Sequence, residues 1–290
     1  MSPGSKPALT RRSWLIAFCA LVALAVGLSV WGVAIEPNRL VVRDVDLPLP
    51  TWPASHPPLK VALLADLHAG APFMTAQKFA EIAALTNAAE PDLILLLGDY
   101  VSHGVLGHFS VEPEAWAPPL GQLSAPLGVF AVLGNHDWWF DGARVRAVLE
   151  RSGVTVLDNE MLALDHRGGV VLLAGIGDLW EGNPDIPGTL SSVGDAEPIL
   201  VMTHNPDLIR QMPSRVALTV AGHTHGGQVN LPLVGRLVVP SDYGQRYAYG
   251  HVDEAGRNLF VTAGIGTSIL PVRFNQPPEI VILTVRSASD

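Results

Sequence analysis

Residues 128–137 read GVFAVLGNHD, and this stretch shows most directly how the chain is built. Its first six residues are apolar and lack helical spacing, which is typical of a short buried strand. Its last three residues carry a carboxamide, an imidazole and a carboxylate. In open α/β sheets, binding sites form just beyond the carboxyl ends of strands. The stretch therefore predicts a central strand that delivers Asn135, His136 and Asp137 to a functional site.

Four further stretches repeat this arrangement of an apolar run followed by groups that bind cations or transfer protons. The runs are 61–65 before Asp66 and His68, 93–97 before Asp99, 199–202 before His204, and 217–221 before His223 and His225. Taken alone, most of these pairs are more typical of turns than of ligand sets. Gly-His-Thr-His at 222–225 is more specific, because residues two apart point to the same side of an extended chain. Five such strand ends together indicate one composite site.

The order of the predicted elements indicates an α/β fold with two sheets. In the first half, strands at 61–65, 93–97, 128–133 and 170–174 alternate with helices at 76–89 and 143–151. In the second half, strands at 199–202, 217–221, 236–239, 258–262 and 279–285 are joined mainly by loops, with a short helical piece at 207–212. We expect this half to form a second, more antiparallel sheet. The predicted architecture is a four-layer sandwich, with two mixed sheets packed face to face between outer helices.

The N-terminal segment has the features of a single transmembrane helix. Residues 14–35 carry no charge, and as a helix they would span roughly 33 Å against roughly 30 Å of bilayer hydrocarbon. Lys6, Arg11 and Arg12 precede this run without an acidic residue. The positive-inside rule therefore places residues 1–13 in the cytoplasm and the body outside it, at a bacterial cell membrane.

Residues 10–15, TRRSWL, resemble a twin-arginine export signal, although an ordinary signal-anchor also begins in this way. Gly32-Val33-Ala34 offers a loose cleavage site, so the body is either held by an uncleaved helix or exported after cleavage near Ala34. The length of the apolar run favours the uncleaved anchor. Residues 36–58 are rich in proline and predict an edge strand and a link. Residues 59–290 remain as the functional domain.

Composition narrows the partners and ligands of the body. Beyond the basic N-terminus, 15 of the 18 basic residues remain against all 27 acidic residues. An acidic body is a poor partner for a phosphate backbone, so we expect no nucleic-acid binding. The single cysteine, Cys19, lies in the apolar segment. A metal in the body would therefore be held by nitrogen and oxygen, which suit Mn, Fe, Zn or Mg.

Taken in order, the five clusters resemble the signature of the calcineurin-like metallophosphoesterase superfamily over about residues 60–230. The motifs are Asp66-x-His68, Gly98-Asp99, Gly134-Asn135-His136-Asp137, His204 and Gly222-His223-x-His225. The twin-arginine start, Gly226-Gly227-Gln228 and the C-terminal stretches 264–267, 273–275 and 277–279 are similar to exported or membrane-anchored bacterial phosphodiesterases of that superfamily.

The resemblance implies a role for each matching residue at a centre of two divalent metal ions. It assigns the first metal to Asp66, His68 and His225, and the second to Asn135, His204 and His223. It makes Asp99 the bridge between them and leaves His136 facing the substrate rather than a metal.

Phosphoester hydrolysis explains why such groups are needed. Two cations about 3.5–4 Å apart neutralise the anionic ester and lower the pKa of a water between them. We predict in-line attack by the bridging hydroxide while His136 protonates the leaving oxygen. Asp137 is expected to accept the other ring N–H of His136 and so to fix its tautomer.

Substrate contacts are harder to predict. Arg273 beside the glycine-rich stretch 264–268, which includes Gly266, suits a phosphate clamp, although such a segment is more often a structural hairpin with a surface arginine. Trp138 and Trp139 either line the cleft or pack the following helix.

Three functions are open at this point. The first is a phosphodiesterase or pyrophosphatase acting on a membrane or envelope phosphoester, which tethering to the membrane would favour. A relative of this kind hydrolyses a UDP-diacylglucosamine lipid precursor, but that substrate faces the cytoplasm. The second is a broad phosphomonoesterase or protein phosphatase on the same metals. The third, a metal-binding scaffold without turnover, is disfavoured because His136 is not needed to bind metal.

Overall fold

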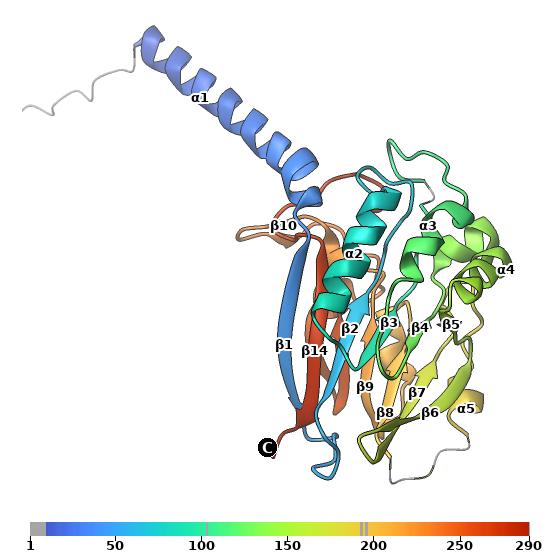
Figure 1. Cartoon of the computed structure of the whole chain (residues 1–290). Coiled ribbons are helices and arrows are strands. Elements are labelled where there is room, and N and C mark those ends of the chain that lie inside the picture. Colours follow the sequence, from blue (N-terminus) through green and yellow to red (C-terminus); the bar gives the residue numbers. More distant parts are fainter. Residues whose placement is uncertain (1–9, 103, 192–193, 195–196, 290) are drawn as a thin grey trace, which may run out of the picture.

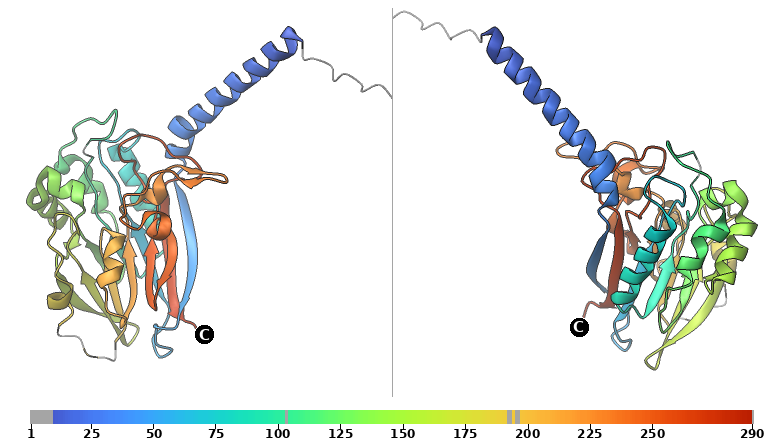
Figure 2. Two further views of the ribbon diagram at one scale, coloured as in Figure 1. Left: turned by 180° about the vertical axis from the view of Figure 1, so that it is seen from behind. Right: turned by 45° about the horizontal axis from the view of Figure 1, so that its top comes forward.

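The computed structural model describes residues 10–102, 104–191, 194 and 197–289, and its body consists of two six-stranded sheets that face each other (Figures 1 and 2). The first sheet has the spatial order β1 (Val41–Leu49), β14 (Glu279–Ser287), β2 (Leu59–Leu64), β3 (Leu93–Leu96), β4 (Val129–Ala131) and β5 (Thr155–Val156). The second has the order β12 (Gly250–Glu254), β13 (Arg257–Val261), β9 (Val216–Ala221), β8 (Ile199–Met202), β7 (Gly169–Gly175) and β6 (Glu160–His166). The predicted sandwich of two mixed sheets is confirmed.

Alternation along the strands distributes apolar side chains among three layers of core. In β3, Leu93 and Leu95 point into the layer between the sheets, while Ile94 and Leu96 point to the outer layer. Helices α2 (Ala76–Ala88), α3 (Pro113–Leu120) and α4 (Asn135–Arg151) cover that outer face of the first sheet. Shorter elements cover the outer face of the second sheet, namely α5 (Ile186–Thr189), η3 (Pro206–Gln211) and η5 (Gly244–Tyr247).

The second sheet departs from the expected antiparallel pairing. Its four central strands, β13, β9, β8 and β7, run parallel to one another, and antiparallel pairs occur only at the edges, in β12–β13 and β6–β7. Both edge pairs are hairpins closed by two residues with positive φ, Arg167-Gly168 and Ala255-Gly256. Such turns match the twist of paired strands and join only neighbouring antiparallel strands.

Two predicted elements have different bounds in the structure. The expected strand at 236–239 is reduced to a separate two-stranded hairpin of β10 (Asn230–Leu231) and β11 (Gly235–Arg236), and Leu237 and Val238 are exposed. Helix α4 begins at Asn135 rather than at residue 143. Its start is stabilised by Asp137 in the first turn, whose carboxylate accepts the backbone N–H of Gly134, the N-cap residue, at 2.9 Å.

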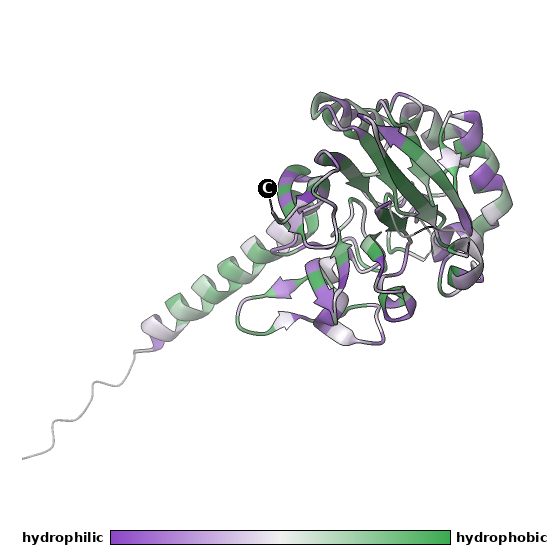
Figure 3. Ribbon diagram, turned by 90° about the horizontal axis from the view of Figure 1, so that it is seen from below, coloured by the Kyte–Doolittle hydropathy of each residue, from purple (hydrophilic) through white to green (hydrophobic). Residues whose placement is uncertain are grey.

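Helix α1 (Arg11–Val30) stands away from the body and continues through a π-helical turn (Trp31–Ile35) and a 3-10 turn (Glu36–Asn38). None of the α1 residues is buried, and Figure 3 shows apolar residues along the helix. Over residues 11–38 this is a candidate membrane span with a mean hydropathy of 2.4 in its most apolar window. Residues 1–9 of the predicted cytoplasmic segment lie outside the described residues.

Candidate metal centre

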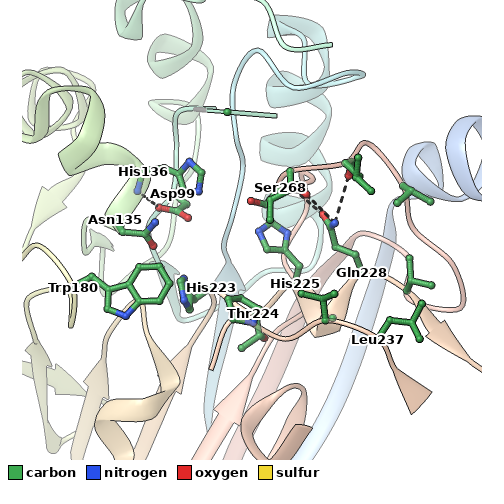
Figure 4. Close-up of a pocket in the computed structure, with 18 of the residues that line it drawn as sticks. Asp99, Asn135, His136, Trp180, His223, Thr224, His225, Gln228, Leu237 and Ser268 are labelled. Atoms are coloured by element: carbon green, nitrogen blue, oxygen red, sulfur yellow. Dashed lines mark hydrogen bonds between the residues drawn. The ribbon is translucent and has the colours of Figure 1, made fainter. Parts of the chain in front are cut away.

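The polar residues predicted at five strand ends meet at one edge of the sandwich, and Figure 4 shows those that line the cleft, such as Asp99, Asn135 and His223. They follow β2, β3 and β4 of the first sheet and β8 and β9 of the second. Three overlapping clusters have ligand atoms within 4.8 Å of one another: Asp66 with His68 and His225, His68 with Asp99 and His136, and Asp99 with His204 and His223. All these residues are buried. His68 and Asp99 each belong to two of the clusters, and Asp99 joins the groups of the first sheet to His204 and His223 of the second.

Backbone turns of an uncommon kind aim these side chains at the same point. Five of the predicted ligands have positive φ, with values of 54° at Asp66, 45° at His68, 58° at Asp99, 69° at His223 and 52° at His225. This region costs a residue other than glycine on the order of 1 kcal/mol or more, and such strain gathers at functional sites. The strand ends are therefore shaped for the convergence of their side chains.

The tautomers of two imidazoles follow from their neighbours. His68 Nδ1 lies 3.1 Å from the carbonyl oxygen of Val101, and His204 Nδ1 lies 2.7 Å from that of Leu97. A carbonyl oxygen only accepts hydrogen bonds, so each imidazole donates from Nδ1 and, in its neutral form, has a lone pair on Nε2. This is the arrangement in which a backbone carbonyl orients a metal-ligating histidine.

The Nε2 atoms of both imidazoles face other ligand atoms of the site. His204 Nε2 lies 3.2 Å from Asp99 Oδ2 and 3.1 Å from His223 Nδ1. His68 Nε2 lies 3.2 Å from His225 Nε2 and 3.7 Å from Asp99 Oδ2. Lone pairs that converge in a buried site need a cation or a shared proton between them. The donor set thus fits metal ions bound by nitrogen and oxygen.

Asn135 adds a further acceptor to this set. Its Oδ1 is buried and has no hydrogen-bond partner among the described residues. A buried carbonyl oxygen of this kind costs free energy unless a ligand satisfies it. Figure 4 shows the Asn135 side chain beside Asp99 in the cleft. The orphaned oxygen is what the predicted role of Asn135 as a metal ligand requires.

The pKa values of the buried groups are shifted by burial and by the charges around them. Burial raises the pKa of Asp66 to about 7, and burial lowers the pKa values of His68 and His223 to about 3. Burial also acts to lower the pKa of His204, but the carboxylates around it, led by Asp99, outweigh this and raise it to about 10. His68 and His223 are therefore neutral and ready to coordinate, whereas His204 is charged beside Asp99 and would release its Nε2 proton on binding a cation.

Asp137 has a different role from the one predicted. Its Oδ1 accepts the backbone N–H groups of Tyr100 (2.8 Å) and Val101 (3.2 Å), and its Oδ2 accepts those of Asp99 (2.8 Å) and Gly134 (2.9 Å). Both oxygens are thus directed to the loop that carries Asp99, not to the imidazole of His136. Asp137 positions this loop, and the expectation that it orients the His136 ring is corrected.

Arg273 and Gly266 are also structural rather than substrate contacts. Arg273 is completely buried, and its guanidinium donates to the backbone carbonyls of Gly266, Ala263, Gly264 and Gln276. Gly266 donates its N–H to the Asp66 carbonyl at 2.6 Å, and a Cβ there would lie 2.7 Å from the Leu67 carbonyl oxygen. Together they support the turn of Asp66 from behind, which is the structural alternative to the phosphate clamp, with Arg273 buried rather than at the surface.

The two tryptophans on α4 lie on different faces of the helix. Trp138 packs against the core outside the first sheet, so its predicted substrate contact is also wrong. Trp139 is exposed over 44% of its surface and lines the cleft, with its ring 4.9 Å from that of His136. Trp180 lines the same cleft, and its ring lies 4.6 Å from His223 and 6.3 Å from Trp139.

The sequence analysis did not identify Asp178 or Trp180. Asp178 is buried, and its Oδ2 accepts the backbone N–H groups of Trp180 (2.8 Å) and Glu181 (3.0 Å), which fixes the turn that carries Trp180. The signal for Asp178 was present, because Gly177-Asp178 follows the end of β7 just as Gly98-Asp99 follows β3. No local pattern marks Trp180, which lies in an irregular loop.

The sequence of this chain is similar to those of known proteins. A family model described as calcineurin-like phosphoesterase matches residues 59–227. The uncharacterized metallophosphoesterase YkuE of Bacillus subtilis is 30% identical over 88% of this chain and 88% of its own length. The phosphodiesterase YaeI of Escherichia coli is 35% identical over 78% of this chain and 82% of its own. A transmembrane protein with a metallophosphoesterase domain from Danio rerio is 28% identical over 99% of this chain and 66% of its own.

The family match spans β2 to the loop after β9 and so includes every strand end that contributes to the centre. The bacterial relatives extend the likeness beyond these bounds, over most of the body. The fold, the donor set and the relatives agree on one conclusion. This chain belongs to the calcineurin-like phosphoesterase family and is a metal-binding hydrolase of phosphoesters.

Proposed function

We propose that the chain is a phosphodiesterase or pyrophosphatase with a dinuclear metal centre, held at the outer face of a bacterial membrane by α1. The observation that carries the proposal is the convergence of imidazole Nε2 atoms on Asp99. His204 approaches Asp99 Oδ2 to 3.2 Å from one side, and His68 approaches it to 3.7 Å. A carboxylate between two groups of nitrogen ligands suits a bridge between two cations.

The ligands would divide into two sets around that bridge. Asp66, His68 and His225 form one buried cluster, and His204 and His223 form another with Asp99. The orphaned Oδ1 of Asn135 adds a ligand to the second set. When bound, two divalent cations such as Mn, Fe, Zn or Mg supply charge neutralisation and an activated water. The sulfur of Cys19 takes no part, because it is exposed on α1.

His136 is the group placed to handle a proton. Its backbone N–H donates to Asp99 Oδ1 at 2.9 Å, which fixes its position beside the centre. Its ring lines the cleft and lies 4.7 Å from the ring of His68. From there the imidazole would hold a proton for the leaving oxygen of the ester. Asp137 contributes by holding the loop of Asp99.

The shape of the cleft favours a phosphate with two substituents. The cleft has a volume of about 530 Å³ and extends on both sides of the centre. Trp139 and Trp180 flank one side, and aliphatic residues that include Leu237 and Ile269 form the other. A phosphomonoester would occupy only one of these sides. The relative YaeI is described as a phosphodiesterase, which supports the same choice.

Membrane anchorage rests on α1 and its charged flank. The helix is apolar and unburied, and Arg11 and Arg12 lie at its N-terminal end. This orientation would leave the body outside the cytoplasm, with twin-arginine export as the proposed route. The Danio rerio relative is described as a transmembrane protein, in agreement with an anchored state. No nucleic acid is proposed as a partner.

The test compares esters and ions on the full-length chain. Metal-stripped protein should regain hydrolysis of bis(4-nitrophenyl) phosphate on addition of single divalent ions, at a higher kcat/KM than for 4-nitrophenyl phosphate. Asp99→Ala should abolish turnover and lower the metal content. Preference for the monoester would favour the phosphomonoesterase alternative. Hydrolysis that needs no added metal, or that survives Asp99→Ala, would contradict the proposal.

A further inference from the structure

The cleft continues from the metal centre along an aliphatic arm. The residues of this arm come from the β10–β11 region and from the segment after β13, namely Val229, Leu237, Val238, Ile269, Leu270 and Val272. Figure 4 shows Leu237 and Gln228 on this side, toward α1, and His136 and Trp180 on the other. None of these six side chains offers a polar group to a substrate. The arm therefore suits a hydrocarbon substituent rather than a sugar or a peptide.

Hydrogen bonds connect this arm to the π-helical and 3-10 turns at 31–38 through which α1 continues, which we call the end of α1. The Gly32 carbonyl accepts the N–H of Arg273 at 2.9 Å, and the buried carboxylate of Glu36 accepts the N–H of Gln276 at 2.7 Å. The same segment pairs with the start of the hairpin, where Phe274 exchanges backbone bonds of 2.9 Å with Gln228 and Asn230. The end of α1, the segment 272–276 and the hairpin thus form one connected unit.

The metal centre is attached to the same unit. The side chain of Gln228 accepts the N–H of Ser268 at 2.7 Å and donates to its carbonyl at 2.9 Å (Figure 4). Gln228 follows His225 by three residues, within the loop after β9. The position of the aliphatic arm is therefore fixed with respect to both the metal centre and the membrane helix.

Exposed apolar side chains surround the open end of the arm. We call these residues the apolar rim: Leu233, Val234, Leu237, Val238, Ile269 and Leu270, each exposed by half or more, with Leu233 fully exposed at the hairpin apex. Figures 1 and 2 place the hairpin beside the end of α1, on the side of the body from which the helix leaves. Arg236 does not interrupt the rim, because its Nε donates inward to the Gly226 carbonyl.

We infer that the apolar rim rests in the surface of the bilayer and that the aliphatic arm binds the hydrocarbon chain of a lipid phosphodiester drawn from that leaflet. This inference rests on the proposed phosphodiesterase function and specifies its substrate class. An exposed apolar patch of this kind marks a membrane or protein contact, and its continuity with an apolar helix selects the membrane. The anchor would then present the cleft to its substrate at the membrane surface.

The reaction needs only water as a second reactant. A water oxygen bonds to phosphorus, the phosphorus–oxygen bond to one substituent breaks, and that oxygen leaves with a proton. With 4-nitrophenyl alkyl phosphodiesters as probes, 4-nitrophenolate leaves and the alkyl phosphate remains. A series from ethyl to octyl changes only the chain that the arm would bind. Full-length protein in non-ionic detergent is assayed at equal substrate mole fractions.

The expected result is a rise in kcat/KM with chain length of about twofold per methylene, since full burial of a methylene corresponds to about fourfold. Leu270→Asp and Leu237→Asp should lower the octyl-to-ethyl ratio of kcat/KM by tenfold or more while hydrolysis of the ethyl ester stays measurable. Val170→Asp is the matched control, because Val170 is an exposed apolar residue on β7 outside the cleft. This control should leave both rates unchanged.

A second experiment distinguishes a membrane lipid from a free amphiphile as the substrate. Leu233→Asp combined with Val234→Asp should slow hydrolysis of a long-chain diester embedded in vesicles by tenfold or more, and should affect the monomeric octyl ester less than threefold. Equal effects on both substrates would overturn the role of the rim at the bilayer. A change of oligomeric state in the double variant, measured by light scattering, would instead identify the rim as a subunit interface and also overturn it.

A wrong inference and a wrong proposed function would give different experimental results. If the wild-type protein hydrolyses the ethyl and octyl esters equally well, the inference is wrong and the proposed phosphodiesterase function stands. If no diester is hydrolysed with any added ion, the proposed function itself is wrong and the inference falls with it.

Discussion

At the scale of single residues, the candidate centre depends on which nitrogen of each imidazole carries hydrogen. Carbonyls of Val101 and Leu97 hold the protons of His68 and His204 on Nδ1, and the Nε2 atoms then point toward Asp99. His136 differs from these two, because its fixed contact with Asp99 is made by its backbone N–H. The ring of His136 lines the cleft, where a substrate would meet it.

Replacing His136 tests this distinction. His136→Ala should keep its metal content while losing turnover by about 10²- to 10⁴-fold, the usual contribution of a general acid. The loss should be largest for esters with poor leaving groups, since these need the proton most. Elemental analysis and a series of aryl leaving groups measure the two effects. His136 also clusters with His68 and Asp99, so a lower metal content would make it a ligand instead.

Arg273 is the second residue with a sharp expectation. Arg273→Met would remove a buried cation and leave the carbonyls of Ala263, Gly264 and Gly266 without their donor. We expect a loss of about 3 kcal/mol or more in the free energy of unfolding, together with weaker metal binding through the Asp66 turn. Denaturant titration measures the loss. Arg151→Ala, at a residue 62% exposed, is the control and should change stability by no more than about 0.5 kcal/mol.

At the scale of elements, strand ends were predictable and the packing of helices was not. An apolar run followed by Asp, Asn or His marks a strand and its functional end within a few residues, which is why Asp66, Asp99 and His204 were found. Helix α4 starts earlier than its apolar spacing indicates, because Asp137 caps it from within the functional cluster. Which of two adjacent tryptophans faces the core depends on the helix phase, and residues 138 and 139 do not encode that phase by themselves.

The two tryptophans of α4 provide a matched pair of variants. Trp138→Ala should lower the free energy of unfolding by about 2–4 kcal/mol through lost core packing, with KM changed little. Trp139→Ala should raise KM for aryl diesters severalfold and lower stability by about 1 kcal/mol or less, since the ring lines the cleft. Thermal or chemical denaturation and steady-state kinetics distinguish them. The reverse pattern would show that the faces of α4 have been assigned wrongly.

Contacts between distant segments were the part that the sequence left open. The burial of Arg273 depends on the turn at 263–266 folding around it. An arginine near a glycine-rich stretch also occurs in phosphate clamps, so the local pattern does not decide its role. The exposed run at 237–238 has the composition of a strand but lies outside both six-stranded sheets, and Leu237 only extends the β10–β11 hairpin through its N–H to the Val229 carbonyl. Both outcomes are decided by tertiary placement rather than by local pattern.

At the scale of the whole molecule, two sheets bring their functional ends to one edge, and a membrane helix is fastened to the loops beside that edge. The first sheet contributes Asp66, His68, Asp99 and Asn135, and the second contributes His204 and the pair after β9. Neither sheet alone holds enough ligands for two cations. The centre is thus a property of the sandwich, and it can form only when the two sheets are packed.

The most direct measurement is anomalous diffraction from crystals of the full-length chain equilibrated with Mn²⁺ or Zn²⁺. The account predicts two peaks about 3.5–4 Å apart, one on each side of the Asp99 carboxylate, with Asn135 and His204 beside one and Asp66 and His225 beside the other. A single peak at saturating metal, or peaks that do not contact Asp99, would contradict it.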